Sequence, residues 1–176
     1  EASERVASGF NSHIEVLHVR ADPRGLVPYT GEGMDGTMIE EIMDVTEKES
    51  GLRASKVHDA FRSFCDTNEN LLLNGDNSSQ ATTISWSEEV GREDEVVSIR
   101  GRLFDIIAVG QPAKDQALPS PITLEAALLD TGRPVMMVPP NLPSTTGKHI
   151  AVAWESSTEA TRAISGAIPL LEKAER

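Results

Sequence analysis

The sequence predicts an α/β fold built on an open parallel sheet. Two short, almost uninterrupted apolar runs, residues 105–110 and 134–139, are typical of strands that helices cover on both faces. Between them, residues 122–130 form a helix-forming segment of the length that a right-handed crossover between parallel strands needs. This order of strand, helix and strand is half of an open α/β sheet.

The N-terminal part of the chain supplies a helix, a strand and a long second helix. Residues 1–10 have helical spacing, and the apolar run at residues 13–19 predicts a strand. After a loop rich in Pro and Gly at residues 21–36, a long helix is predicted because apolar side chains recur at three- and four-residue intervals. These side chains are Met38, Ile39, Ile42, Val45, Leu52, Val57, Phe61 and Phe64. Asp35 or Thr37 can cap this helix.

The middle of the chain leads from the long helix to the two apolar runs. Residues 67–79 hold Asn, Gly, Asp and Ser around a Leu-rich patch and are typical of a connection. Residues 82–88 alternate polar and apolar side chains, as a half-buried strand does. The next helix is expected over residues 92–103, directly before the first apolar run.

The C-terminal end predicts a linker, a new strand and a new helix. Residues 141–147 have a linker composition, and residues 149–154 have the pattern of a strand. Residues 158–175 predict a helix, with Ser156 and Glu159 as a candidate capping box.

A short echo links the two ends of the chain. The segment EATRAI, which begins at Glu159, repeats the pattern of EASERV, which begins at Glu1. Interpreted as a repeat, this echo predicts a fragment of a tandem protein. We therefore expect a domain at residues 1–140 that lacks its first strand, a linker at residues 141–147, and the first strand and helix of a second repeat at residues 148–176.

Composition and charge exclude several classes of function. The net charge of −12 and the pI near 4.7 argue against a surface for nucleic acid or for an anionic membrane, because such surfaces need clustered Lys and Arg. Cys65 is the single cysteine and cannot form an internal disulfide. No apolar run approaches the length of a membrane span or of a signal-peptide core. The sequence therefore predicts a cytoplasmic protein.

Taken in order, these elements resemble the universal stress protein family. GRLFDIIAVGQP, at residues 101–112, is similar to the fourth strand and turn of that family, and TGRPVMMVPP, at residues 131–140, is similar to its fifth strand. HIEVLHV, at residues 13–19, is similar to the second strand. The tail HIAVAWESSTEATRAISGAIPLLEKAE resembles the first strand and helix of a second repeat. The resemblance covers most of the chain outside residues 21–36 and 67–81.

The resemblance is nearest to the tandem, two-domain bacterial members, which are UspA-like. It implies an open parallel sheet of five strands in the order 3-2-1-4-5 with helices on both faces, the Rossmann-like architecture of the adenine nucleotide alpha hydrolase-like folds. The family is often dimeric. Some members bind ATP across the carboxyl ends of the strands, which is where open α/β sheets generally bind ligands.

The nucleotide site of the family is only partly preserved in this sequence. ATP-binding members have one glycine after the fourth strand, a second glycine three residues later and a Gly-Ser or Gly-Thr pair further on, so that backbone N–H groups can reach the phosphates. Gly110 matches the first glycine, but Ala113 and Thr123 replace the others. Pro121, at the start of the following helix, has no N–H to donate. The phosphate cradle is therefore expected to be absent or rebuilt.

If a nucleotide binds, the resemblance places it against five residues in two segments. These residues are Gly110, Gln111, Val138, Glu155 and Ser156. Glu155 stands where the family has an Asp that contacts the nucleotide. The alternative interpretation of Gly110 and Gln111 is an ordinary turn that ends a strand. We expect no cofactor, with ATP as the alternative.

No catalytic constellation is evident in the sequence. The four histidines lack the paired spacing of a metal site, and Cys65 ends an apolar helical face, which favours a buried inert thiol over a nucleophile. Glu88 and Glu89 follow a predicted strand, where a solvated acidic edge is favoured over a ligand-facing carboxylate. The glycine-rich residues 31–36 favour a mobile loop over a phosphate cradle. We therefore expect no enzyme.

The expected topology leaves the central first strand to be supplied. Residues 149–154 can fill the gap in the same chain or by exchange with a partner chain, and a dimer that shares strands or faces its fifth-strand edges is favoured. The function predicted from the sequence is a universal stress protein-like, non-enzymatic module that acts by dimerisation or by binding protein partners. The alternatives are an adenine-nucleotide sensor with a variant site and, on the same sheet architecture, a hydrolase or nucleotidyl transferase.

Overall fold

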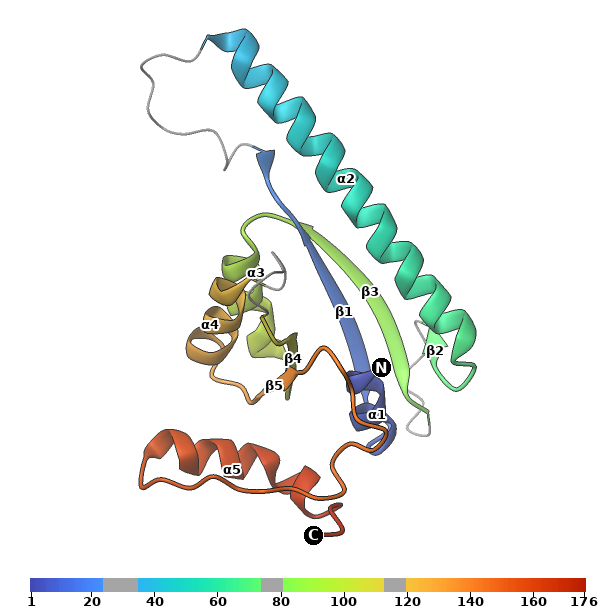
Figure 1. The fold of residues 1–176 in the computed structure, drawn as a ribbon, viewed down its shortest axis with the longest axis vertical. Helices are drawn as coiled ribbons and strands as arrows, with labels where there is room; N and C mark the ends of the chain where they lie inside the picture. Colours follow the sequence, from blue (N-terminus) through green and yellow to red (C-terminus); the bar gives the residue numbers. More distant parts are fainter. Residues whose placement is uncertain (24–34, 74–80, 113–119) are drawn as a thin grey trace. The chain divides into compact units, whose positions relative to one another are not determined.

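The computed structural model describes residues 1–23, 35–73, 81–112 and 120–176, and the chain divides into two compact units (Figure 1). One unit comprises Phe10–Val96. The other joins Glu1–Gly9 to Val97–Arg176. Each unit contains its own parallel sheet, so the predicted α/β class is confirmed.

The unit Phe10–Val96 is built on a three-stranded parallel sheet in the order β1-β3-β2. The strands are β1 (His13–Arg20), β2 (Leu72–Leu73) and β3 (Thr83–Val90). The predicted strands at residues 13–19 and 82–88 are confirmed, and they pair from His13 with Thr83 to Arg20 with Val90. The short strand β2 lies where a connection was predicted.

Helix α2 (Gly36–Thr67) provides the crossover between β1 and the rest of this sheet. Asp35 is its N-cap, because the Asp35 carboxylate accepts a hydrogen bond from the backbone N–H of Thr37 at 2.6 Å. The Thr37 hydroxyl, which donates to the same carboxylate, lowers the pKa of Asp35, and the backbone hydrogen bond lowers it further. Of the two predicted caps, the structure selects Asp35. Figure 1 shows the C-terminal half of α2 beside the sheet and its first turns beyond the end of β1.

The core of this unit lies between α2 and the sheet. Cys65, Leu71 and Ile84 form a buried cluster. The partly buried side chains packed against it are Ile14, Val16, Phe61 and Phe64. Leu71 directly precedes β2, and its burial explains why a segment with turn composition nevertheless joins the sheet.

The second unit contains the predicted succession of strand, helix and strand. Strand β4 (Ile107–Gly110) pairs in parallel with β5 (Val135–Val138), and α4 (Pro121–Asp130) connects them. The other elements are the helix α1 (Ala2–Ser8), the helix α3 (Glu93–Arg100), which reaches across the boundary of the units, the 3-10 turn η2 (Gly101–Leu103) and the helix α5 (Thr158–Leu171).

Close packing in the second unit leaves no room for a side chain at Gly101. A Cβ atom at this position would lie 2.8 Å from Ile107 Cδ1 and 2.8 Å from Thr131 Cγ2, which is closer than carbon atoms pack. The glycine therefore lets η2 approach the start of β4 and the end of α4.

Three predictions need correction. The strands of the described residues form two sheets rather than a single five-stranded one. Residues 149–154 are not a strand, because an alternating segment becomes a strand only when it pairs with a sheet edge, and neither sheet includes it. The cap of the last helix is Ser157 rather than Ser156, since the Ser157 hydroxyl accepts the N–H of Ala160 at 3.1 Å. The predicted division at residues 141–147 stays a prediction.

Ile84 provides a test of the first core. Only 2% of Ile84 is exposed, whereas Val90, on the same strand, is 60% exposed. We expect Ile84→Ala to lower the free energy of unfolding by about 2–4 kcal/mol, because it leaves a cavity under α2. Val90→Ala, the matched control, should change it by less than about 0.5 kcal/mol. Urea denaturation of both variants measures the difference, and equal effects would contradict this account of the core.

Candidate functional site

Three of the predicted nucleotide-contacting residues meet at the carboxyl ends of β4 and β5. Gly110 is the residue paired with Val138, and the Gln111 backbone N–H donates to the Val138 carbonyl at 2.7 Å. The Gln111 N–H therefore extends the sheet and is not directed at a ligand. This geometry agrees with the interpretation of Gly110 and Gln111 as the end of a strand.

The backbone N–H groups at the N-terminus of α4 already donate hydrogen bonds to Ser120. Pro121 occupies the first turn and has no N–H. The Ile122 N–H donates to the Ser120 hydroxyl at 3.3 Å, and the N–H groups of Thr123 and Leu124 donate to the Ser120 carbonyl at 3.1 and 3.3 Å. Phosphate binding at a helix N-terminus requires unengaged N–H groups. The described part of this segment therefore offers no ready phosphate cradle. Ala113 lies outside the described residues, as do residues 31–34 of the glycine-rich segment.

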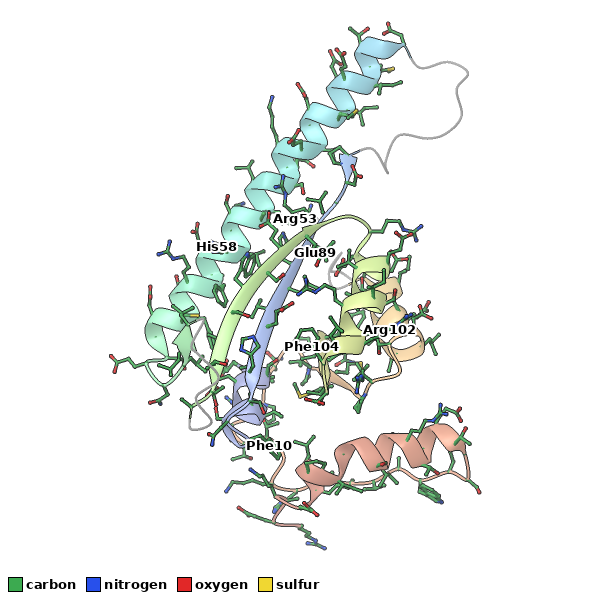
Figure 2. The ribbon with its side chains drawn as sticks, turned by 180° about the vertical axis from the view of Figure 1, so that it is seen from behind. Phe10, Arg53, His58, Glu89, Arg102 and Phe104 are labelled. Carbon is green, nitrogen blue, oxygen red and sulfur yellow. The ribbon has the colours of Figure 1, made fainter. Side chains whose placement is uncertain are left out.

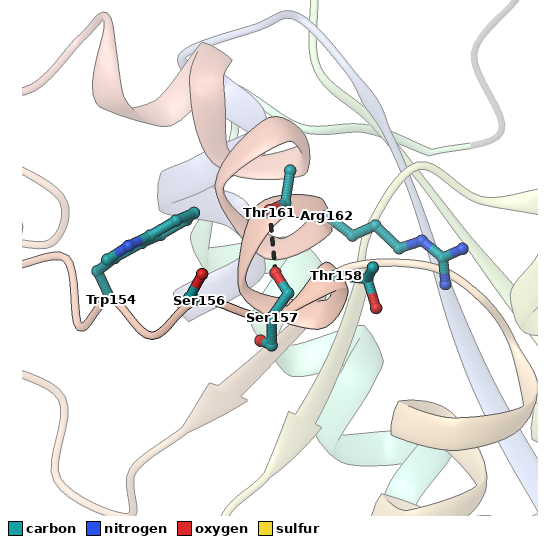
Figure 3. Close-up of a pocket in the computed structure, with 6 residues that line it drawn as sticks. All are labelled: Trp154, Ser156, Ser157, Thr158, Thr161 and Arg162. Carbon is teal, nitrogen blue, oxygen red and sulfur yellow. Dashed lines mark hydrogen bonds between the residues drawn. The ribbon is translucent and has the colours of Figure 1, made fainter.

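The other two predicted residues, Glu155 and Ser156, are exposed and lie just before α5. The Glu155 carbonyl accepts the N–H of Ser157 at 2.9 Å, which turns the chain into the helix. Ser156 lines a shallow pocket of about 380 Å³ at this turn (Figure 3). The described residues that line it are Trp154, Ser156, Ser157, Thr158, Thr161 and Arg162.

The chemistry of this pocket combines an indole ring, hydroxyl groups and one cation. Trp154 is 60% exposed and presents a flat apolar surface. Much of the hydroxyl capacity is already used, because the Thr161 hydroxyl donates to the Ser157 carbonyl at 3.0 Å and the Ser157 hydroxyl caps α5. Figure 3 shows Arg162 extending away from Trp154. The two side chains are therefore not arranged around one ligand.

The five predicted residues lie at two places in the second unit, the ends of β4 and β5 and the turn before α5. Gly110, Gln111 and Val138 belong to the sheet end, and none of them lines the pocket beside Ser156. Glu155 lies next to the pocket in sequence and is also not part of its lining.

Sequence reasoning missed an aromatic cluster that joins α2 to the sheet. His58, on α2, meets the ring of Trp86, on β3, edge to face with the centroids 5.1 Å apart. Phe61 and His18 also contact Trp86, at centroid distances of 5.4 and 5.8 Å. Figure 2 shows His58 projecting from α2 toward β3. The signal was present in the helical spacing of His58 and Phe61, which places both on the inner face of the helix.

Two other titratable candidates, His13 and Glu88, have structural partners. The ring nitrogens of His13 lie 2.8 Å from the Thr83 hydroxyl and 2.9 Å from the Ser85 hydroxyl. Glu88 forms an ion pair with Arg20 at 3.4 Å, so its carboxylate is held at the sheet end rather than presented to a ligand. Within the described residues, no group of three or more His, Cys, Asp or Glu side chains could hold a metal ion.

Comparisons with protein-family models, with curated proteins and with solved structures gave no match. A separate search for membrane-spanning elements found no helix, in the parts of the chain that the structure describes, with the length and apolar character that crossing a bilayer requires.

Cys65 is a buried thiol with low expected reactivity. Burial raises the pKa of the Cys65 thiol, and the negative charge of Asp66 raises it further. Because the thiolate is the reactive form, we expect Cys65 in the folded protein to react with a disulfide reagent at pH 8 at least about tenfold more slowly than an exposed thiol. Ser63→Cys places an exposed thiol on the same helix as the matched control. Equal rates for the two thiols in the folded protein would show that the α2 face opens readily.

Proposed function

We propose that this protein is a non-enzymatic, universal stress protein-like module of the cytoplasm that acts by dimerisation or by binding a protein partner. The proposal includes little affinity for ATP. One observation carries this part: the backbone N–H groups beside Gly110, which matches the first glycine of the family's nucleotide site, already donate hydrogen bonds. Gln111 donates to β5, and the first-turn N–H groups of α4 donate to Ser120. A nucleotide would have to displace these hydrogen bonds, which costs about 0.5–1.5 kcal/mol for each one.

The pairings of the strands support the resemblance on which this proposal rests. In the family's order 3-2-1-4-5, the second strand pairs with the third and the fourth with the fifth. By the resemblance, β1 and β3 stand for the family's second and third strands, and β4 and β5 for its fourth and fifth. Strand β1 pairs with β3, and β4 pairs with β5, all in parallel. We propose that residues 149–154 take part in association with a second copy of the chain. The exposure of Val152 and Trp154, 50% and 60%, supports a role for this segment in association.

A second candidate function is that of an adenine-nucleotide sensor with a variant site. The observation that favours it is the pocket before α5, where the exposed indole of Trp154 could stack on a base and Arg162 could attract a phosphate. This candidate requires Arg162 to turn toward Trp154 on binding. It also leaves Glu155, a carboxylate, next to an anionic ligand.

The two candidates predict different results in native mass spectrometry. At a protein concentration above the dissociation constant of the dimer, we expect a dimer. It should carry no bound small molecule, because the donors beside Gly110 are occupied. Isothermal titration with ATP and Mg²⁺ should then give no binding heat.

A bound mass of ATP or AMP would instead support the sensor, and Arg162→Ala should then abolish the binding while Arg53→Ala, on α2, should not. ATP turnover that disappears in Glu155→Gln would overturn the non-enzymatic assignment.

A further inference from the structure

Helix α2 carries a row of exposed apolar side chains. Met38, Val45 and Leu52 are 54%, 55% and 65% exposed. They follow one another at intervals of seven residues, which is close to two helical turns, so they lie one above another on a single face. We call Met38, Val45 and Leu52 the outer row of α2.

The outer row points away from the core of its own unit. Ala54 and Cys65, each 7% exposed, mark the buried face of α2. The helical repeat places both of them about half a turn around the helix from Val45. The buried face is therefore already used for packing against the sheet, and the outer row is a second apolar surface on the same helix.

Two oppositely charged residues flank the centre of the outer row. Glu41 and Lys48 are exposed and lie on the same side of the row, one before Val45 and one after it. Together with the row they give the alternating three- and four-residue spacing of a helix that packs against another helix. Polar residues at such positions select the orientation and the register of the pair.

This arrangement is complementary to itself when a second helix runs in the opposite direction. A parallel pair in register would place Glu41 against Glu41 and Lys48 against Lys48. An antiparallel pair centred on Val45 places Glu41 of each helix beside Lys48 of the other. It also places Met38 of each helix opposite Leu52 of the other, because both lie seven residues from Val45.

We propose that the outer row of α2 docks on the outer row of a second copy of this chain, antiparallel and with Val45 at the two-fold axis. This inference rests on the dimerisation in the proposed function and names the surface for it. The contact is isologous, so a single patch supplies both sides. The acidic side chains of Glu41 and Glu49 beside the row disfavour an anionic membrane as the occupant. A face with three apolar side chains per copy is small, so we expect a dissociation constant on the order of tens of micromolar.

Charge exchange between Glu41 and Lys48 tests the contact. Glu41→Lys and Lys48→Glu each place like charges together in the dimer, and we expect each to weaken dimerisation about tenfold. The double variant E41K/K48E restores opposite charges and should return the dissociation constant to within about threefold of the original. An equimolar mixture of the two single variants should also dimerise, because the lysine introduced in one variant then meets the glutamate introduced in the other.

Sedimentation equilibrium of the full chain from about 1 to about 300 µM gives these constants. Glu40→Lys is the matched control, since it makes the same charge change on an exposed residue of α2 outside the outer row. It should change the constant by less than about threefold. Circular dichroism checks that every variant keeps its helix content, as expected for substitutions at exposed positions.

The outcomes separate this inference from the proposed function. A dimer that no α2 variant weakens would overturn the outer row as the interface and leave dimerisation standing. Weakening by both single variants without rescue in the double variant or in the mixture would overturn the antiparallel pairing. A protein that stays monomeric over the whole concentration range would overturn both this inference and the dimerisation in the proposed function.

Discussion

The first unit depends on the parallel pairing of β1 with β3. This ladder runs over the full length of both strands, and it joins segments that lie 70 residues apart in the chain at the pair His13 and Thr83. Parallel neighbours cannot be joined by a tight turn, so a crossover must cover one face of the sheet. Helix α2 is that crossover, and its inner face supplies the apolar side chains that bury Ile84. The core, the aromatic cluster around Trp86 and the outward direction of Val45 all follow from this one pairing.

The second unit depends in a comparable way on backbone N–H groups that already have hydrogen-bond partners. A strand end becomes a ligand site when its N–H groups are left without partners, and here the N–H of Gln111 continues the sheet. The start of α4 is closed in the same way by Pro121 and Ser120. A sheet edge that resembles a nucleotide site in sequence can thus be a purely structural feature. Among the described residues of the second unit, Val152 and Trp154 expose apolar surface to solvent.

Local patterns were enough to predict most of the elements. The apolar runs, the helical spacing after Asp35 and the crossover segment before β5 depend on periods of two or 3.6 residues, which the sequence displays directly. Pairing is not local, and two predictions failed there, although the parallel pairing of β4 with β5 was confirmed. Leu72–Leu73 joins a sheet although its neighbours have turn composition, because Leu71 is buried in the core. Residues 149–154 have the pattern of a strand but pair with neither sheet. The predicted site stays a prediction, since Gly110 and Ser156 are connected only by the resemblance.

The aromatic cluster around Trp86 also has a spectroscopic consequence. The chain has two tryptophans, and each of the two units contains one of them. Trp86 is partly shielded by His58 and Phe61, whereas Trp154 is 60% exposed. The two side chains therefore differ in the wavelength of their emission maximum and in their accessibility to a dissolved quencher. The native chain carries its own pair of optical reporters, one for each unit, without any label being added.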